Sequence, residues 1–208
     1  MSIIGNWRGT PCSESVNIVS EMSIRRPFET NRTRRHREGE LSKFNEGEIS
    51  DIEEFGCEVL SVELSESSPP GFSYTIGVYD TCGQPEALVV GLPFRTAHAL
   101  LNEAASRLRR GTDLTQGRHG EMLGKVDCEF RPVDPKWARH LMLGANWFYR
   151  ETEYPAIQAV FPDLDNRFPE DPDFDRCFIQ PLLQMEALVT ELEEAFWKAT
   201  DYSASQRG

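Results

Sequence analysis

Long apolar runs are missing from this sequence of 208 residues. No stretch approaches the roughly 18 consecutive apolar residues of a membrane-spanning helix, so we expect no membrane contact. The opening residues, MSIIGNWRGTPCSES, also lack a basic segment that leads into an apolar one, which is the pattern of a secretory signal. Both absences predict a cytoplasmic protein.

Cysteine is sparse, and its five positions are widely scattered. A disulfide scaffold has a denser, even set, so reduced thiols are the better interpretation and agree with a cytoplasmic location. No C-x-x-C pair, zinc-ligand spacing, H-E-x-x-H or G-x-S-x-G motif is present. We therefore predict no metal site, and no motif identifies a cofactor.

Positive charge is in the minority, since 22 Lys and Arg stand against 34 Asp and Glu and the net charge is −12, yet it is concentrated in one segment. Residues 25–37, RRPFETNRTRRHR, hold six arginines and one glutamate. An acidic chain repels nucleic acid, so nucleic acid could be contacted only through Arg25 to Arg37. The same segment could equally lie across the acidic body of the chain or an acidic partner, or remain a solvated tail.

The apolar residues are numerous enough for a core, because 39% of the chain is hydrophobic and it includes twelve Phe and four Trp. Alternating or continuous apolar runs predict strands at residues 57–64, 72–79, 86–92, 125–133 and 156–162. Apolar residues spaced three or four apart predict helices at residues 48–56, 93–111, 134–151 and 179–200.

This order predicts an α+β fold with a mainly antiparallel or mixed sheet of five to six strands, packed by about three helices. Residues 1–45 have no sustained apolar period and are predicted to be a flexible, Arg-rich arm. We expect the domain itself at residues 46–178, followed by a C-terminal amphipathic helix and tail at 179–208.

Three blocks of the chain resemble a known family: GFSYTIGV, QPEALVVGLP and NWFYRETEYPAIQAVFPDLDNRFPEDPDF. In this order they are similar to a bacterial domain of unknown function, DUF4262, from roughly Glu53 to Phe174. The resemblance implies a bacterial, cytosolic context and no particular activity. The Arg-rich segment lies outside it.

The hairpin at residues 71–92 supplies the first site candidates. The hydroxyls of Tyr74 and Thr75 could lie at the mouth of a cleft and bind a ligand, and Glu86 could be a catalytic carboxylate. The alternative is structural, because Tyr and Thr both favour strands. A Glu at the start of a strand is also often a solvated edge or half of an ion pair.

Two further segments carry candidates. His119, between two glycines in a loop predicted at residues 112–124, is the best-placed general base, although an exposed loop histidine often has no role. In the acidic loop after residue 161, Asp163 and Arg167 could bind a small ligand, with Arg167 contacting an anion. They could instead pair with each other and cap turns.

Two classes of function fit these features. The first is a binding or accessory module that contacts a protein partner or a small ligand. The second is a small-molecule hydrolase or transferase whose cleft is built from the Tyr74 strand, the His119 loop and the Asp163–Arg167 loop. A pocket in which these residues converge favours the enzyme, and their dispersal favours the module.

Overall fold

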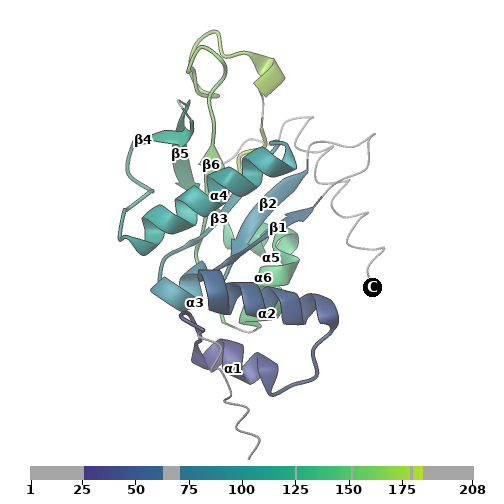
Figure 1. Ribbon diagram of the computed structural model, residues 1–208. Coiled ribbons are helices and arrows are strands. Elements are labelled where there is room, and N and C mark those ends of the chain that lie inside the picture. Colours follow the sequence, from purple (N-terminus) through teal and green to yellow (C-terminus); the bar gives the residue numbers. More distant parts are fainter. Residues whose placement is uncertain (1–25, 63–70, 125, 151, 179, 185–208) are drawn as a thin grey trace, which may run out of the picture.

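The computed structural model, drawn in Figure 1, describes residues 26–62, 71–124, 126–150, 152–178 and 180–184. From residue 185 onward, the predicted C-terminal helix lies outside the described residues.

A six-stranded mixed sheet forms the centre of the molecule. Its strands are β1 (Glu58–Val62), β2 (Phe72–Ile76), β3 (Glu86–Val90), β4 (Arg118–Leu123), β5 (Val126–Pro132) and β6 (Ala156–Val160), in the order β1-β2-β3-β6-β5-β4. Neighbours run antiparallel except β3 and β6, which are parallel. The α+β prediction with a mixed sheet is confirmed.

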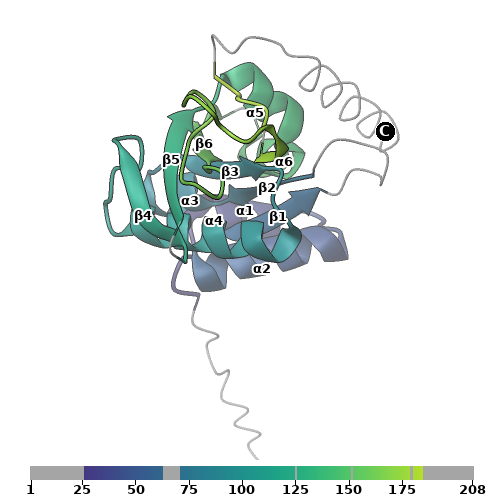
Figure 2. The same ribbon diagram turned by 90° about the horizontal axis from the view of Figure 1, so that it is seen from above.

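Helices cover both faces of this sheet. They are α1 (Asn31–Arg37), α2 (Lys43–Phe55), α3 (Val78–Cys82), α4 (Phe94–Arg109), α5 (Pro135–Leu141) and α6 (Leu143–Tyr149), with a short 3-10 helix at Arg176–Phe178. Figure 2 shows α4 on one side of the sheet and α5 with α6 on the other.

Strand β3 is buried on both faces, as its continuous apolar run predicts. Ala87 and Val89 join the core under α4, whereas Leu88 and Val90 join the core under α5 and α6. Because side chains alternate along a strand, one five-residue segment contributes to both cores.

Two elements differ from the sequence prediction. The strand expected at residues 72–79 ends at Ile76, and α3 follows where a turn was expected. Gly77 makes this change of direction with φ of 103°, and a Cβ there would lie 2.9 Å from Cγ2 of Ile52. The loop expected around His119 is instead the edge strand β4, which pairs irregularly with β5.

The helix expected at residues 134–151 is divided into α5 and α6 at Met142, whose φ and ψ are −90° and 59°. Just after the break, the N–H of Gly144 donates to the hydroxyl of Tyr74 at 3.0 Å. A Cβ on Gly144 would lie 2.9 Å from Cδ1 of Ile76, so the glycine allows α6 to approach β2 closely.

Residues 26–45 are structured, in contrast to the mobile arm predicted for them. Thr30 caps α1, and Thr33 and His36 are buried against the domain. Four of this segment's arginines form ion pairs with acidic residues of the same chain: Arg26–Glu53, Arg32–Asp80, Arg34–Glu29 and Arg37–Glu53. Of the alternatives that the sequence left open, the described part of the segment therefore lies across the acidic body.

Candidate functional site

Glu86 is the centre of a buried polar network. It starts β3 after Pro85, and its side chain is 0% exposed. Its Oε1 accepts from the N–H groups of Gly77 at 2.9 Å and Tyr79 at 3.0 Å, and from the hydroxyl of Tyr149. Its Oε2 accepts from Oγ1 of Thr75 at 2.5 Å. Four donors from three separate elements thus meet on one carboxyl group.

The network has no cationic partner for Glu86 among the described residues. Burial raises the pKa of the Glu86 carboxyl, and the hydrogen bonds from Thr75 and Tyr149 act in the opposite direction. Burial and the neighbouring Glu86 also raise the pKa of the Tyr149 hydroxyl. Burial and the four donors therefore act in opposite directions on the Glu86 carboxyl.

Thr75 and Tyr74 lie in the interior of the domain and not at the mouth of a cleft, since they are 0% and 1% exposed. Oγ1 of Thr75 also accepts from the N–H of Ala87 at 2.9 Å, so the side chain replaces a backbone acceptor between β2 and β3. Tyr74 holds the N-terminal end of α6 through Gly144.

We expect Thr75→Val to lower the free energy of unfolding by about 1–2 kcal/mol. Valine keeps the shape of threonine, but it leaves the Ala87 N–H without its side-chain acceptor and removes one donor to Glu86. Urea denaturation followed by circular dichroism measures the change. Thr75→Ser, which keeps the hydroxyl, is the matched control, and equal losses in both variants would contradict this account.

His119 lies far from Glu86. It is on β4, and β5 and β6 separate β4 from β3, which places the two strands about 14 Å apart at ordinary strand spacing. Its Nε2 lies 3.0 Å from the carbonyl oxygen of Leu114, and its side chain is half-buried. The structure does not bring the two predicted catalytic residues together.

Asp163 and Arg167 organise their own loop. Asp163 is 4% exposed and accepts from the N–H groups of Asp165, Arg167 and Asp175, and from Nε of Arg167 at 2.9 Å. Burial favours a higher pKa for Asp163, but these hydrogen bonds outweigh it and lower the pKa to about 2. The bonds of Asp163, including the one to Arg167, therefore stabilise the conformation of this loop.

A cavity of about 520 Å³ lies beside α5, α6 and the segment that leads into β6. We call it the α5–α6 cavity. Pro135, Ala138 and Pro155 form its apolar wall. This volume falls within the range of ligand pockets, and none of the six residues predicted from the sequence lines it.

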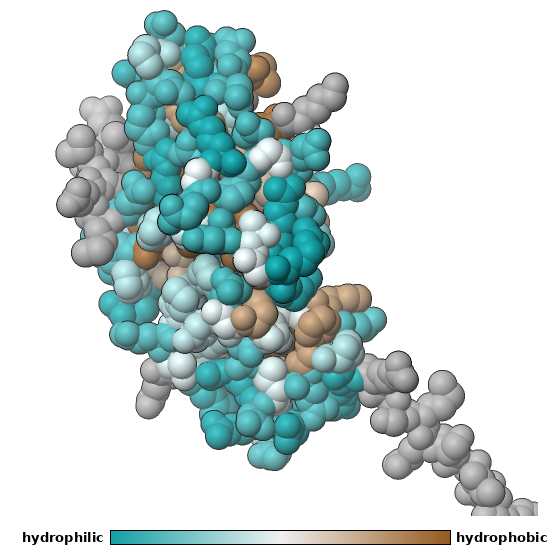
Figure 3. Space-filling view, turned by 90° about the vertical axis from the view of Figure 1, so that its left-hand side faces the viewer, coloured by the Kyte–Doolittle hydropathy of each residue, from teal (hydrophilic) through white to brown (hydrophobic). Residues whose placement is uncertain are grey.

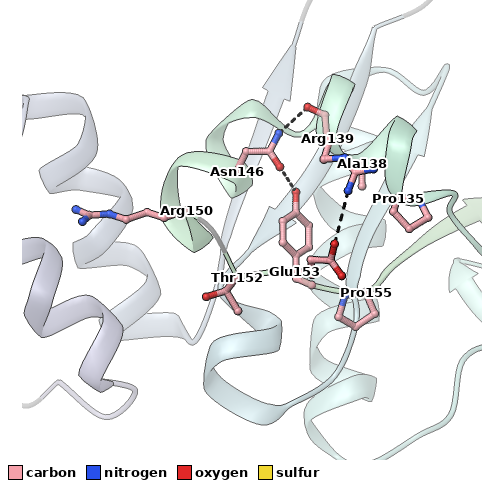
Figure 4. Close-up of a pocket in the computed structure, with 9 residues that line it drawn as sticks. Pro135, Ala138, Arg139, Asn146, Arg150, Thr152, Glu153 and Pro155 are labelled. Carbon is pink, nitrogen blue, oxygen red and sulfur yellow. Dashed lines mark hydrogen bonds and ion pairs between the residues drawn. The ribbon is translucent and has the colours of Figure 1, made fainter.

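Polar groups of the cavity are connected to one another. Asn146 donates to the carbonyl of Arg139 at 2.6 Å and accepts from the hydroxyl of Tyr154 at 2.8 Å. Nη1 of Arg139 lies 3.8 Å from a carboxylate oxygen of Glu153, and both side chains are exposed. Figure 4 shows these groups facing one another, with Arg150 extending away from them.

The cavity adjoins the buried network through two aromatic rings. The ring of Tyr154 lies 4.6 Å from that of Tyr149, which donates to Glu86. Sequence reasoning missed Tyr149, Tyr154 and Arg139. A signal for Tyr149 was present, since a buried phenol and a buried carboxyl each need a hydrogen-bond partner.

Large exposed apolar side chains are spread over several segments: Phe44 and Phe55 at the two ends of α2, Phe94 on α4, Val126 on β5, Leu143 on α6 and Leu164 after β6. The face drawn in Figure 3 is mostly hydrophilic, with small apolar groups between the polar residues. Single exposed apolar residues are ordinary in a soluble domain. On this face the described residues do not offer the broad apolar patch that is typical of a protein interface.

Two negative findings concern the residues that the structure describes. No helix among them has the length and apolar character needed to cross a lipid bilayer. Within the same residues, no three His, Cys, Asp or Glu side chains come together as metal ligands.

The described chain is thus an α+β domain with a buried carboxyl network and an adjacent surface cavity. Residues 51–175 match the family model DUF4262, a domain of unknown function, and the chain belongs to that family. The family predicted from the three sequence blocks is confirmed. No curated protein and no solved structure matches the chain.

Proposed function

We propose that this protein is a binding module, and that its ligand is a small organic anion with an apolar body. The α5–α6 cavity carries this proposal, because it combines an apolar wall with an arginine at its rim. Ligand pockets commonly pair an apolar lining with a few polar groups that orient the ligand.

Arg139 is the group that would bind the anion. Its contact with Glu153 is long and solvent-exposed, so its replacement by a ligand carboxylate or sulfonate costs little. Asn146 holds the Arg139 carbonyl and the Tyr154 hydroxyl at the same time, which fixes the polar side of the cavity. Pro135 and Pro155 offer a rigid apolar surface for the body of the ligand.

The enzyme remains the alternative prediction. It needs His119, Glu86 and the Asp163–Arg167 pair around one substrate, and the two strands that lie between His119 and Glu86 favour the module instead. Contact with nucleic acid through Arg25 to Arg37 also remains a proposal, although ion pairs within the chain use four of the six arginines.

We propose a cytoplasmic location as well. Cys57 and Cys128 are buried as free thiols, and burial raises the pKa of Cys57 to about 11 and that of Cys128 to about 12. Such thiols are inert core residues that need no oxidising compartment.

The proposal is tested by titrating the full chain with 8-anilinonaphthalene-1-sulfonate, an aromatic anion whose fluorescence rises on binding. We expect saturable binding near one probe per chain. Arg139→Ala should raise the dissociation constant about tenfold, which is the loss of one charge-assisted hydrogen bond. Octanoate should displace the probe, whereas octanol, which has the same chain length without the charge, should not.

Arg95→Ala is the matched control, because Arg95 is an exposed arginine on α4, on the other side of the sheet. It should leave the dissociation constant unchanged. Non-saturable fluorescence, or equal effects of the two substitutions, would refute the cavity as the binding site. Thermal melts of all variants verify that the probe reports the folded protein.

A further inference from the structure

The turn that follows α6 has a strained backbone. Arg150 has φ of 55° and ψ of −118°, and the N–H of Thr152 donates to the carbonyl of Tyr149 at 3.1 Å. These angles are those of the second residue of a type II′ turn, a position that favours glycine. An arginine there persists only where the surroundings hold it. Both Arg150 and Thr152 line the α5–α6 cavity.

The surroundings of this turn include an arginine from α1. Nη1 of Arg32 donates to the carbonyl of Tyr149 at 3.0 Å, and Nη2 donates to Oγ1 of Thr152 at 3.2 Å. The guanidinium thus bonds to Tyr149 and Thr152, on either side of the strained Arg150. It also lies 5.1 Å from the centre of the Tyr149 ring.

Arg32 is itself fixed in place. Its Nε donates to Oδ1 of Asp80 at 3.1 Å, and Oδ2 of Asp80 accepts from the hydroxyl of Thr30 at 2.5 Å. Thr30 is the N-cap of α1, so one aspartate of α3 holds both the cap and the arginine. At the other end of α1, Nε2 of His36 lies 2.9 Å from the carbonyl oxygen of Phe148.

We infer that Arg32 is a positioning residue of the ligand site, through which helix α1 holds the cavity wall in shape. The inference rests on the proposed function of the α5–α6 cavity. Three bonds from one planar guanidinium connect α1, α3 and the turn, which a lysine cannot reproduce with a single ammonium. When α1 no longer contacts the turn, the backbone of Arg150 relaxes to unstrained angles. The shape of the cavity wall then changes as well.

The experiment compares Arg32→Ala with Arg34→Ala in the full chain. Arg34 lies on the same helix and carries the same charge, but it pairs with Glu29 at 2.9 Å, away from the turn. Hydrogen exchange of the Thr152 amide, followed by NMR, reports closure of the turn. Titration with 8-anilinonaphthalene-1-sulfonate reports the cavity.

We expect Arg32→Ala to speed exchange of the Thr152 amide at least tenfold and to raise the probe's dissociation constant at least fivefold. Arg34→Ala should change neither. A second substitution, Arg150→Gly, should restore slow exchange in the Arg32→Ala background, because glycine adopts these angles without strain. A general loss of stability would not be repaired at this amide alone.

Each outcome bears on one of the two proposals. Unchanged Thr152 exchange in Arg32→Ala overturns the positioning role, and faster exchange with an unchanged dissociation constant overturns its link to the cavity. If the unaltered chain does not bind the probe, the proposed function fails, and exchange alone decides whether Arg32 holds the turn. If Arg32→Ala does not fold, Arg32→Lys replaces it, with a smaller expected change in the same direction.

Discussion

Glu86→Ala is expected to lower the free energy of unfolding by about 4 kcal/mol, which places it among the most damaging single substitutions in a domain of this size. The substitution leaves the donors of Gly77, Tyr79, Thr75 and Tyr149 without their acceptor inside the protein. It also opens a void where the side chain was fully buried. Urea denaturation measures the loss.

Glu86→Gln is the matched variant, because it keeps the volume and one acceptor oxygen. We expect a cost of about 1 kcal/mol, since the amide can direct its oxygen to the two backbone N–H groups and its nitrogen to Thr75. Burial raises the pKa of Glu86, a direction that favours a neutral side chain at this position, and Gln is neutral. An alanine variant within about 1 kcal/mol of the unaltered protein would contradict the network.

The second large effect concerns pH. Glu48 is 3% exposed, its Oε1 has no hydrogen-bond partner, and burial raises its pKa to about 7. The folded protein therefore binds this proton more tightly than the unfolded chain. The stability that results is fully present below the ordinary pKa of glutamate and is lost as pH rises through 7.

We expect Glu48→Gln to remove part of the fall in stability between pH 5 and pH 8, on the order of 3 kcal/mol. Urea denaturation at both pH values gives the slope. Burial and the neighbouring Asp51 raise the pKa of Glu58 to about 8, and the charge of Glu48 also contributes. Glu48→Gln therefore reduces the share of Glu58 in the fall as well, in the same direction.

Glu54→Gln, at an exposed position of the same helix, controls for the loss of a charge and should keep the slope of the unaltered protein. Equal slopes in the Glu48 variant and the unaltered protein would show that Glu48 does not bind this proton in the folded state.

The sequence alone determined the fold class, the family and most strands. The continuous apolar run of β3 predicted burial on both faces because side chains alternate along a strand. The apolar stripe of α4 predicted a helix that covers the sheet. Such periodic patterns are local, so they can be read without knowing which segments meet.

The sequence also singled out Tyr74, Thr75 and Glu86, but it did not indicate which hydrogen bonds these residues form. Their hydrogen bonds join β2, β3 and the start of α6, and the spacing along the chain does not reveal such contacts. The same limit applies to α1, whose polar, Arg-rich sequence is typical of a solvated tail. Its ion pairs with Glu53 and Asp80 are formed with residues that are distant in the sequence.

Only the tertiary structure decided where a ligand could bind. In the folded chain two strands lie between His119 and Glu86, and Asp163 and Arg167 bond to each other. It brought Pro135 and Arg139 of α5 next to Tyr154 at the entry to β6. Strand order and helix docking follow from how two faces of one sheet are covered, and that is a property of the whole chain rather than of any segment.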